Sequence, residues 1–224
     1  MSKIKRLVAL KYGETYIDEG MAYRGGDRTK KLPISLIIYL LETDSRKILV
    51  DAGCDTMPGF ELSHFCSPVE VLGRLGIGAD EITDLILTHA HHDHAEATHH
   101  YKNATVHIES GEISAARGFI PESMALEVFS DRKIIDDCVE IIKIGGHSKG
   151  SCIVEFDYKG KKYVICGDEC YVHRCLDEKI PTGASLSKEI SLEFVEKYGN
   201  NEQYSTLLCH DYEILTGQNG IWEF

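Results

Sequence analysis

The sequence has little positive charge and no long hydrophobic run. Its 224 residues include 24 lysines and arginines against 36 aspartates and glutamates, a formal net charge of −12. A nucleic-acid-binding protein normally presents a basic face, and this chain shows none. The longest apolar run, residues 36–41, has the length of a β-strand, whereas a membrane-spanning helix needs roughly 20 residues. Neither nucleic acid nor a membrane is therefore expected as a partner.

The N-terminus also lacks the pattern of a secretory signal. Basic residues precede the apolar residues 7–10, but this stretch is too short for the hydrophobic region of a signal peptide. The eight cysteines are irregularly spaced, which favours reduced and mostly buried thiols over a disulfide framework. Cys166 and Cys170 do not form a C-x-x-C pair and are interpreted as core or pocket-wall residues. The sequence thus predicts a cytoplasmic protein.

No repeat, low-complexity tract or linker rich in proline, glycine or serine divides the chain, so a single domain over residues 1–224 is expected. Helices are predicted at residues 67–76, where Pro68 follows the N-cap Ser67, and at residues 187–198, before Gly199. Residues 110–130 are predicted to be helical or irregular. Apolar patterns predict strands at residues 4–10, 34–42, 47–51, 84–88, 105–108, 139–144, 152–157, 163–166 and 205–209.

The densest chemical signal is the segment Thr-His-Ala-His-His-Asp-His at residues 88–94, directly after an apolar run. Four imidazoles with a carboxylate among them are suitable ligands for a divalent metal such as zinc. In a tight turn, His89 and His91 can point at one ion, while Asp93 and His94 can point at a second. Each ion then needs further ligands from elsewhere in the chain.

Three candidates for these ligands lie just past the ends of other predicted strands. Loops at strand ends are where a rigid scaffold places reactive groups. A carboxylate has two oxygens and can bridge two cations, which suits Asp168. The sequence therefore predicts a site for two metals, with His89, His91 and His147 on one, Asp93, His94 and His210 on the other, and Asp168 between them.

The T-H-x-H-x-D-H run resembles the signature of the metallo-β-lactamase superfamily. The Gly-His pair at 146–147, the Gly-Asp pair at 167–168, His210 and the Val-Asp-x-Gly element at residues 50–53 fall in that superfamily's order. The resemblance implies an α+β fold, a four-layer αββα sandwich in which two mixed β-sheets carry helices on both outer faces. It also implies a dimetal site at one edge of the two sheets.

Within that superfamily, the chain is most similar to the N-acyl-homoserine-lactonase-like branch. Tyr171 follows Asp168 by three positions, as the substrate-contacting tyrosine of those lactonases does, and His210 and Asp211 close the set. The likeness implies a metal-dependent hydrolase with a small-molecule substrate. A metal-bridging hydroxide would attack the carbonyl of a lactone or related ester, such as an acyl-homoserine lactone.

The same likeness implies roles for individual residues. One metal and the Tyr171 hydroxyl would stabilise the oxyanion, and Asp93 would pass a proton to the leaving alkoxide. Asp51 would orient a ligand histidine from outside the metal shell. Two divalent cations are expected, zinc first, although iron, manganese or cobalt also suit a nitrogen and oxygen ligand set. The oligomeric state cannot be read from the sequence.

The chain departs from those lactonases at three places, one of which is a short span between His94 and His147. Residues 148–151 read Ser-Lys-Gly-Ser where a proline and a second histidine are common, and His92 fills a position that is more often aromatic or small. These departures leave the ligands intact but concern the substrate wall. Two alternatives share the metal core: a thioesterase of the glyoxalase II type, and a non-catalytic metal-dependent binding module. The chain leaves little room after His210 for the helical extension of such thioesterases.

The remaining histidines are expected to have structural or surface roles. His92 is predicted to point away from the metals, with lining of the cavity as the alternative. His173 is assigned to the surface or core, with substrate contact as the alternative, and Asp211 either supports a ligand or forms a turn. Surface or satisfied core positions are predicted for His64, His99, His100 and His107, with His99 and His100 on a helix face or end.

Overall fold

The computed structural model describes residues 3–212 and 220–224. One group of strands comprises β1 (Arg6–Asp18), β2 (Lys31–Glu42), β3 (Lys47–Val50), β4 (Asp84–Ile86), β5 (Thr105–Glu109), β6 (Ala125–Phe129) and β12 (Ile221–Glu223). A second group comprises β7 (Arg132–Ile135), β8 (Val139–Lys143), β9 (Cys152–Tyr158), β10 (Lys161–Ile165) and β11 (Tyr204–Leu207). The α-helices are α1 (Glu19–Ala22), α2 (Pro68–Gly73), α3 (His92–Ala95), α4 (Ile113–Ala116), α5 (His173–Glu178) and α6 (Lys188–Tyr198), and the 3-10 helices are η1 (Ala79–Glu81), η2 (Glu96–His100) and η3 (Gly167–Glu169).

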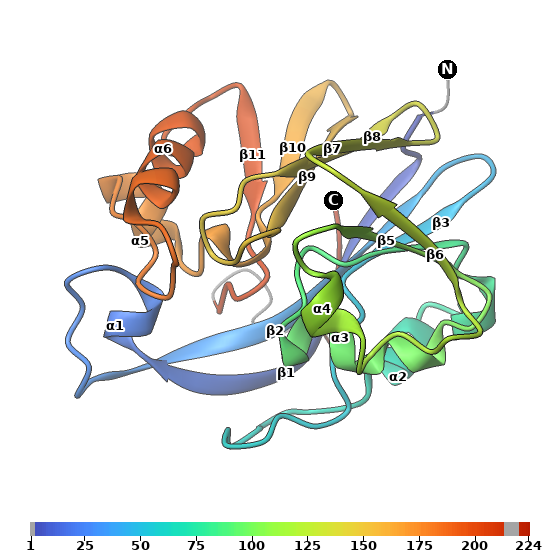
Figure 1. Ribbon diagram of the computed structural model, residues 1–224, viewed down its shortest axis with the longest axis horizontal. Helices are drawn as coiled ribbons and strands as arrows, with labels where there is room; N and C mark the ends of the chain where they lie inside the picture. The colour runs from blue at the N-terminus through green and yellow to red at the C-terminus, as the bar shows by residue number, and fades with distance from the viewer. Residues whose placement is uncertain (1–2, 213–219) are drawn as a thin grey trace.

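The strands form two mixed sheets. The seven-stranded sheet has the order β12-β1-β2-β3-β4-β5-β6, antiparallel from β12 to β3 and parallel from β3 to β6. The five-stranded sheet has the order β11-β10-β9-β8-β7, with only β10 and β11 parallel. Helices α5 and α6 lie on one side of the pair of sheets, and α2, α3 and α4 lie on the other (Figure 1).

Strand β2 shows why the sheets stack. Its residues point alternately to opposite faces, as the two-residue period of a strand requires. Ile37, Tyr39 and Leu41 enter a core between the two sheets, together with residues of β8 and β9. Leu36, Ile38 and Leu40 enter a second core under the helices of the first sheet. The continuous apolar run at residues 36–41 is therefore a strand buried on both faces.

A third core lies under α5 and α6. Ile153 and Val164 of the second sheet pack there against Leu176, Phe194 and Val195 of the two helices. Helix α6 begins where the sequence predicts, because the Ser187 side chain accepts a hydrogen bond from the backbone N–H of Ile190. Three cores between successive layers make a four-layer αββα sandwich, which confirms the predicted fold. No helix in the described part of the chain is long and apolar enough to cross a bilayer.

Several element predictions were wrong or incomplete. Strand β1 continues to Asp18, well past residue 10, because a bulge between Lys11 and Gly13 lets pairing with β2 resume after the apolar pattern breaks. The segment at residues 110–130 contains a strand, β6, and the next strand, β7, which begins the second sheet, was also missed. Four of the five β6 residues are exposed, including the apolar Leu126 and Val128, so burial in this edge strand does not follow the apolar pattern of its sequence. Helix α2 ends at Gly73 rather than near residue 76.

Leu85→Ala should lower the free energy of unfolding by about 2–5 kcal/mol, because Leu85 is fully buried in a central strand and its removal leaves a cavity. The matched control is Leu126→Ala on β6 of the same sheet, where the side chain is 45% exposed. That variant should change the free energy by about 0.5 kcal/mol or less. Urea denaturation of both variants measures the difference, and equal losses would contradict the layer assignment.

Candidate metal centre

The histidine-rich segment lies in the turn that follows β4 and opens α3. Asp51, at the end of the neighbouring β3, holds this turn through its carboxylate. Its Oδ1 accepts the backbone N–H of Thr88 at 2.8 Å, and its Oδ2 accepts the Thr88 hydroxyl at 3.0 Å. The same Oδ2 lies 2.7 Å from Nδ1 of His94. Asp51 has a left-handed backbone with φ of 64°, which aims both oxygens at the segment.

The structure brings together all seven residues predicted as metal ligands. Their ligand atoms fall into two groups, each with its members within 4.8 Å of one another: His89, His91, His147 and Asp168 in one, and Asp93, His94 and His210 in the other. This proximity is what a dimetal site requires, while the role of each residue as a ligand stays a prediction.

Asp168 lies between the two groups, as a bridging carboxylate would. Its Oδ2 is 3.5 Å from Nε2 of His89 and 3.3 Å from Nε2 of His147. Its Oδ1 is 3.0 Å from Nε2 of both His94 and His210. Each oxygen of this one carboxylate therefore faces histidines of a different group.

The orientation of the imidazoles suits cation binding. Nδ1 of His147 lies 2.5 Å from the Ala184 carbonyl oxygen, and Nδ1 of His210 lies 2.9 Å from that of Ser35. Each Nδ1–H thus donates outward, which leaves the Nε2 lone pair facing the centre. Nε2 of His89 and of His94 are buried and make no hydrogen bond within the described chain. Such orphaned atoms cost free energy that a bound cation would recover.

The pKa shifts of the predicted ligands also favour cation binding. Burial lowers the pKa of His89 and of His91, so both rings are held in the neutral form that binds a metal. Burial also opposes a charge on His94, but the carboxylates of Asp168, Asp51 and Asp93 together outweigh it and raise the pKa of His94. Burial likewise opposes ionisation of Asp168, yet the surrounding histidines hold its pKa well below the usual value. The cluster is a negative pocket that favours a cation.

Two buried glutamates that the sequence analysis did not single out shape the loop carrying His147. Glu169 accepts the backbone N–H groups of Gly146 and His147 at 3.1 and 3.2 Å, and the Ser151 hydroxyl at 2.5 Å. Burial raises the pKa of Glu169. A Cβ at position 146 would lie 2.4 Å from Glu169 Oε2, so a larger residue there would have to displace this carboxylate.

Glu112 joins the same loop to the histidine segment. It accepts the backbone N–H of Ala90 at 3.0 Å, the backbone N–H of Gly150 at 2.7 Å and the Ser148 hydroxyl at 2.7 Å. The serine and glycine that set this loop apart from the lactonase pattern thus have a structural role. Nothing in the sequence marks Glu112 among the 36 acidic residues, whereas Glu169 could have been noticed directly after Asp168.

A cavity of about 380 Å³ opens onto the centre. Its polar wall contains His91, His92, Asp93, His147, Asp168, Tyr171 and His210. The rest of its lining is largely apolar and includes Ile17, Met21, Ile34, Met57 and Phe60. The cavity therefore places reactive polar groups against a surface that suits a hydrocarbon.

Tyr171 belongs to this polar wall. Its hydroxyl donates a hydrogen bond to Asp168 Oδ2 at 2.6 Å, and its ring stacks on His210 with centroids 4.9 Å apart. Burial raises the pKa of Tyr171, so the phenol remains a donor at neutral pH. His92 also lines the cavity, which was the alternative considered for it, and it belongs to neither group of predicted ligands. Its ring packs edge-on against Phe119.

The other histidines mostly occupy the structural positions expected of them. His64 is exposed, and buried His107 lies 2.9 Å from Asp84. His173 pairs with buried Asp211 at 2.7 Å, so Asp211 contacts a neighbouring histidine that is not among the predicted ligands. His99 and His100 lie in η2, consistent with a helix end.

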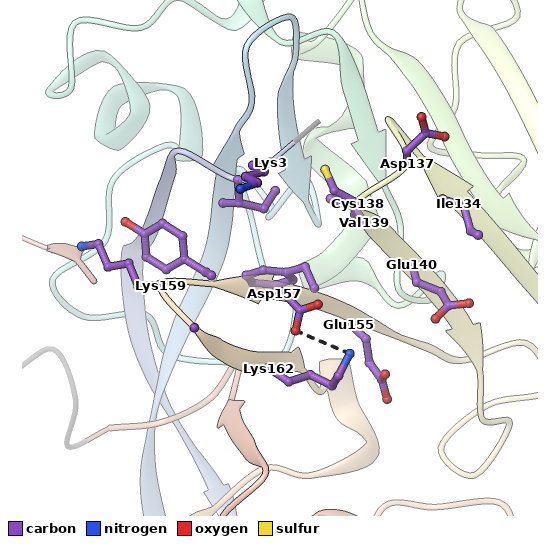
Figure 2. Close-up of a pocket in the computed structure, with 14 residues that line it drawn as sticks. Lys3, Ile134, Asp137, Cys138, Val139, Glu140, Glu155, Asp157, Lys159 and Lys162 are labelled. Carbon is purple, nitrogen blue, oxygen red and sulfur yellow. Dashed lines mark ion pairs between the residues drawn. The ribbon is translucent and has the colours of Figure 1, made fainter. Parts of the chain in front are cut away.

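A larger depression, of about 660 Å³, is formed by β7 to β10 and the N-terminal residues (Figure 2). Its lining carries lysines and carboxylates, including Lys162 and Asp157 at 3.6 Å, and the thiol of Cys138. Among the described residues that line it there is no histidine. Size alone would favour this depression, but ligand chemistry favours the smaller cavity beside Asp168.

The fold and this histidine–aspartate centre define the class of the protein. Residues 38–202 match the family model of the metallo-beta-lactamase superfamily, and the chain belongs to that superfamily. It is 28% identical over 153 residues to a probable metallo-hydrolase of Methanocaldococcus jannaschii, covering 68% of this chain and 64% of that protein's length.

Two further comparisons concern lactonases. The chain is 22% identical over 220 residues to an N-acyl homoserine lactonase of Bacillus thuringiensis, covering 87% of each. A solved N-acyl homoserine lactone hydrolase with its product N-hexanoyl-L-homoserine at the catalytic metal centre superposes with a TM-score of 0.82. That superposition has 20% identity and covers 94% of this chain and 95% of the other, so it establishes the shared fold.

Asp51→Asn should weaken zinc binding by about 10–100-fold. If the amide oxygen keeps the Thr88 N–H, the amide N–H₂ replaces Oδ2 opposite His94 Nδ1. Nδ1 must then accept a hydrogen bond, and the ring proton moves to Nε2, where it blocks the metal side. Competition with a zinc-binding dye measures the change. Asp177→Asn, at an exposed position, is the matched control, and equal zinc affinities for the two variants would refute the role of Asp51.

Proposed function

We propose that the protein is a dimetal hydrolase that opens a lactone or a closely related ester in the cavity beside Asp168. The observation that carries this proposal is the convergence of seven histidine and aspartate side chains, five of which line a cavity whose remaining lining is largely apolar. An acyl lactone has the matching halves, a polar carbonyl ring and a hydrocarbon chain. The similarity to N-acyl homoserine lactonases supports the choice of substrate class.

The donor set fits two divalent cations. His89, His91 and His147 would hold one, Asp93, His94 and His210 the other, and Asp168 would offer one oxygen to each. When bound, such a pair supplies Lewis acidity and a water nucleophile at neutral pH. Zinc suits the nitrogen-rich set, and iron, manganese or cobalt are also compatible with it.

The chain's own residues then provide positioning and proton transfer. The Tyr171 hydroxyl, which points at the centre of the group, would donate to the oxyanion that forms at the substrate carbonyl. Asp93 lies on the cavity wall and would deliver a proton to the leaving alkoxide oxygen. Ile17, Met21 and Phe60 would bind the acyl chain and exclude water.

The proposed activity is tested with purified, zinc-loaded protein on acyl lactones of varied ring and chain size, with matched thioesters in parallel. We expect lactone ring opening that stops on chelation and returns with zinc. His91→Ala should reduce it by on the order of 10³-fold, since metal ligation supplies several kcal/mol. Faster turnover of thioesters would favour the thioesterase alternative. Bound metal without turnover of either class would favour a binding module.

Tyr171→Phe separates catalysis from metal binding. Loss of one oxyanion donor should lower kcat on the order of 10²-fold. Zinc content should stay the same, because the hydroxyl donates to Asp168 rather than replacing a ligand. Tyr163→Phe, on β10 outside the cavity lining, controls for the general effect of removing a hydroxyl. Unchanged kcat in Tyr171→Phe would assign this tyrosine a structural role.

A further inference from the structure

A second group of potential metal ligands lies outside the cavity. Oδ2 of Asp55 is 2.7 Å from Nε2 of His100 and 3.5 Å from Nε2 of His99. The ligand atoms of these three residues all lie within 4.8 Å of one another, and the side chains are 28–47% exposed. None of the three belongs to the dimetal cluster, so the group requires its own explanation.

The orientation of His99 suits cation binding. Its Nδ1 lies 3.2 Å from the Glu96 carbonyl oxygen and donates its hydrogen there. Its Nε2 is directed at the Asp55 carboxylate, where a metal cation can take the place of a proton between the two atoms. An outward Nδ1–H bond to a backbone carbonyl is also the usual support of a metal-binding histidine.

Asp55 is held in place by partners that leave its second oxygen available. The Ser67 hydroxyl donates to Oδ1 at 2.7 Å, and the Asp55 backbone N–H donates to the Glu96 carboxylate at 2.6 Å. Oδ2 therefore faces the two imidazoles without a competing contact to Ser67. The rings of His99 and His100 lie with centroids 4.1 Å apart, so both Nε2 atoms approach from one side.

We propose that Asp55, His99 and His100 bind a further divalent transition-metal ion, with zinc as its simplest occupant, separate from the dimetal centre. Two imidazoles and one carboxylate suit such an ion, and the open side would be completed by water. The cation would join the loop after β3 to η2. That loop also supplies Met57 and Phe60 to the cavity, so the site would anchor one wall of it.

Zinc stoichiometry tests the proposal. The purified protein and His99→Gln/His100→Gln are dialysed against the same micromolar concentration of buffered free zinc, and bound metal is measured by mass spectrometry. We expect the parent to bind one equivalent more than the double variant. His64→Gln, at an exposed histidine elsewhere, should bind as many as the parent. Equal binding by parent and double variant, or the same loss in His64→Gln, would overturn the proposal.

A second variant covers the case in which the double variant does not fold by circular dichroism. Asp55→Asn keeps both histidines and should weaken binding of the extra equivalent by at least about 10-fold. Unchanged affinity would overturn the proposal. All these proteins retain the dimetal cluster, so the difference does not depend on whether that cluster is active. Failure of lactone hydrolysis and failure of the extra site are thus distinguishable.

Discussion

The buried carboxylate of Asp168 is the constraint around which the site is built. A charge removed from water is very costly unless it is paired, and here four imidazole Nε2 atoms lie 3.0–3.5 Å from its two oxygens. His89 and His94 follow β4 of the first sheet, whereas His147 and His210 follow β8 and β11 of the second. The charge is therefore balanced only when the two sheets stack in one relative position, so site and sandwich depend on each other.

A ring of outward hydrogen bonds makes this arrangement specific. The Asp51 carboxylate faces Nδ1 of His94. The Ala184 carbonyl faces Nδ1 of His147, and the Ser35 carbonyl faces Nδ1 of His210. Each bond fixes both the ring angle and the nitrogen that carries the proton, which a loop alone would leave variable. The Ser35 carbonyl belongs to β2 of the first sheet and the Ala184 carbonyl to the segment between α5 and α6, so the orientation of these histidines depends on segments distant in sequence.

The sequence could predict the parts of this design that are local. The composition of residues 88–94 predicts a metal site. His147, Asp168 and His210 could be assigned to the same site because each follows an apolar strand. Strand β6 was missed: it is a five-residue edge strand in which the apolar Leu126 and Val128 are exposed rather than part of a core. The roles of Glu112 and Glu169 were missed for another reason. Their carboxylates accept hydrogen bonds from backbone N–H groups that only the folded loop brings near them. Local chemistry is visible in a sequence, whereas support contributed by distant backbone is not.

The apolar wall of the cavity is also formed by segments that are distant in the sequence. The class of reaction is therefore easier to infer from the sequence than the substrate is. Ile17 belongs to the second half of β1, past the bulge, and Met57 and Phe60 belong to the loop after β3. That loop begins at Asp51, which orients His94, and is tied to the Glu96 carboxylate through the Asp55 N–H. One segment thus sets both the direction of a predicted ligand and the position of the wall. Changes in that loop that resize the cavity will therefore also act on the arrangement of the predicted ligands, which limits how freely the cavity can change while this cluster is retained.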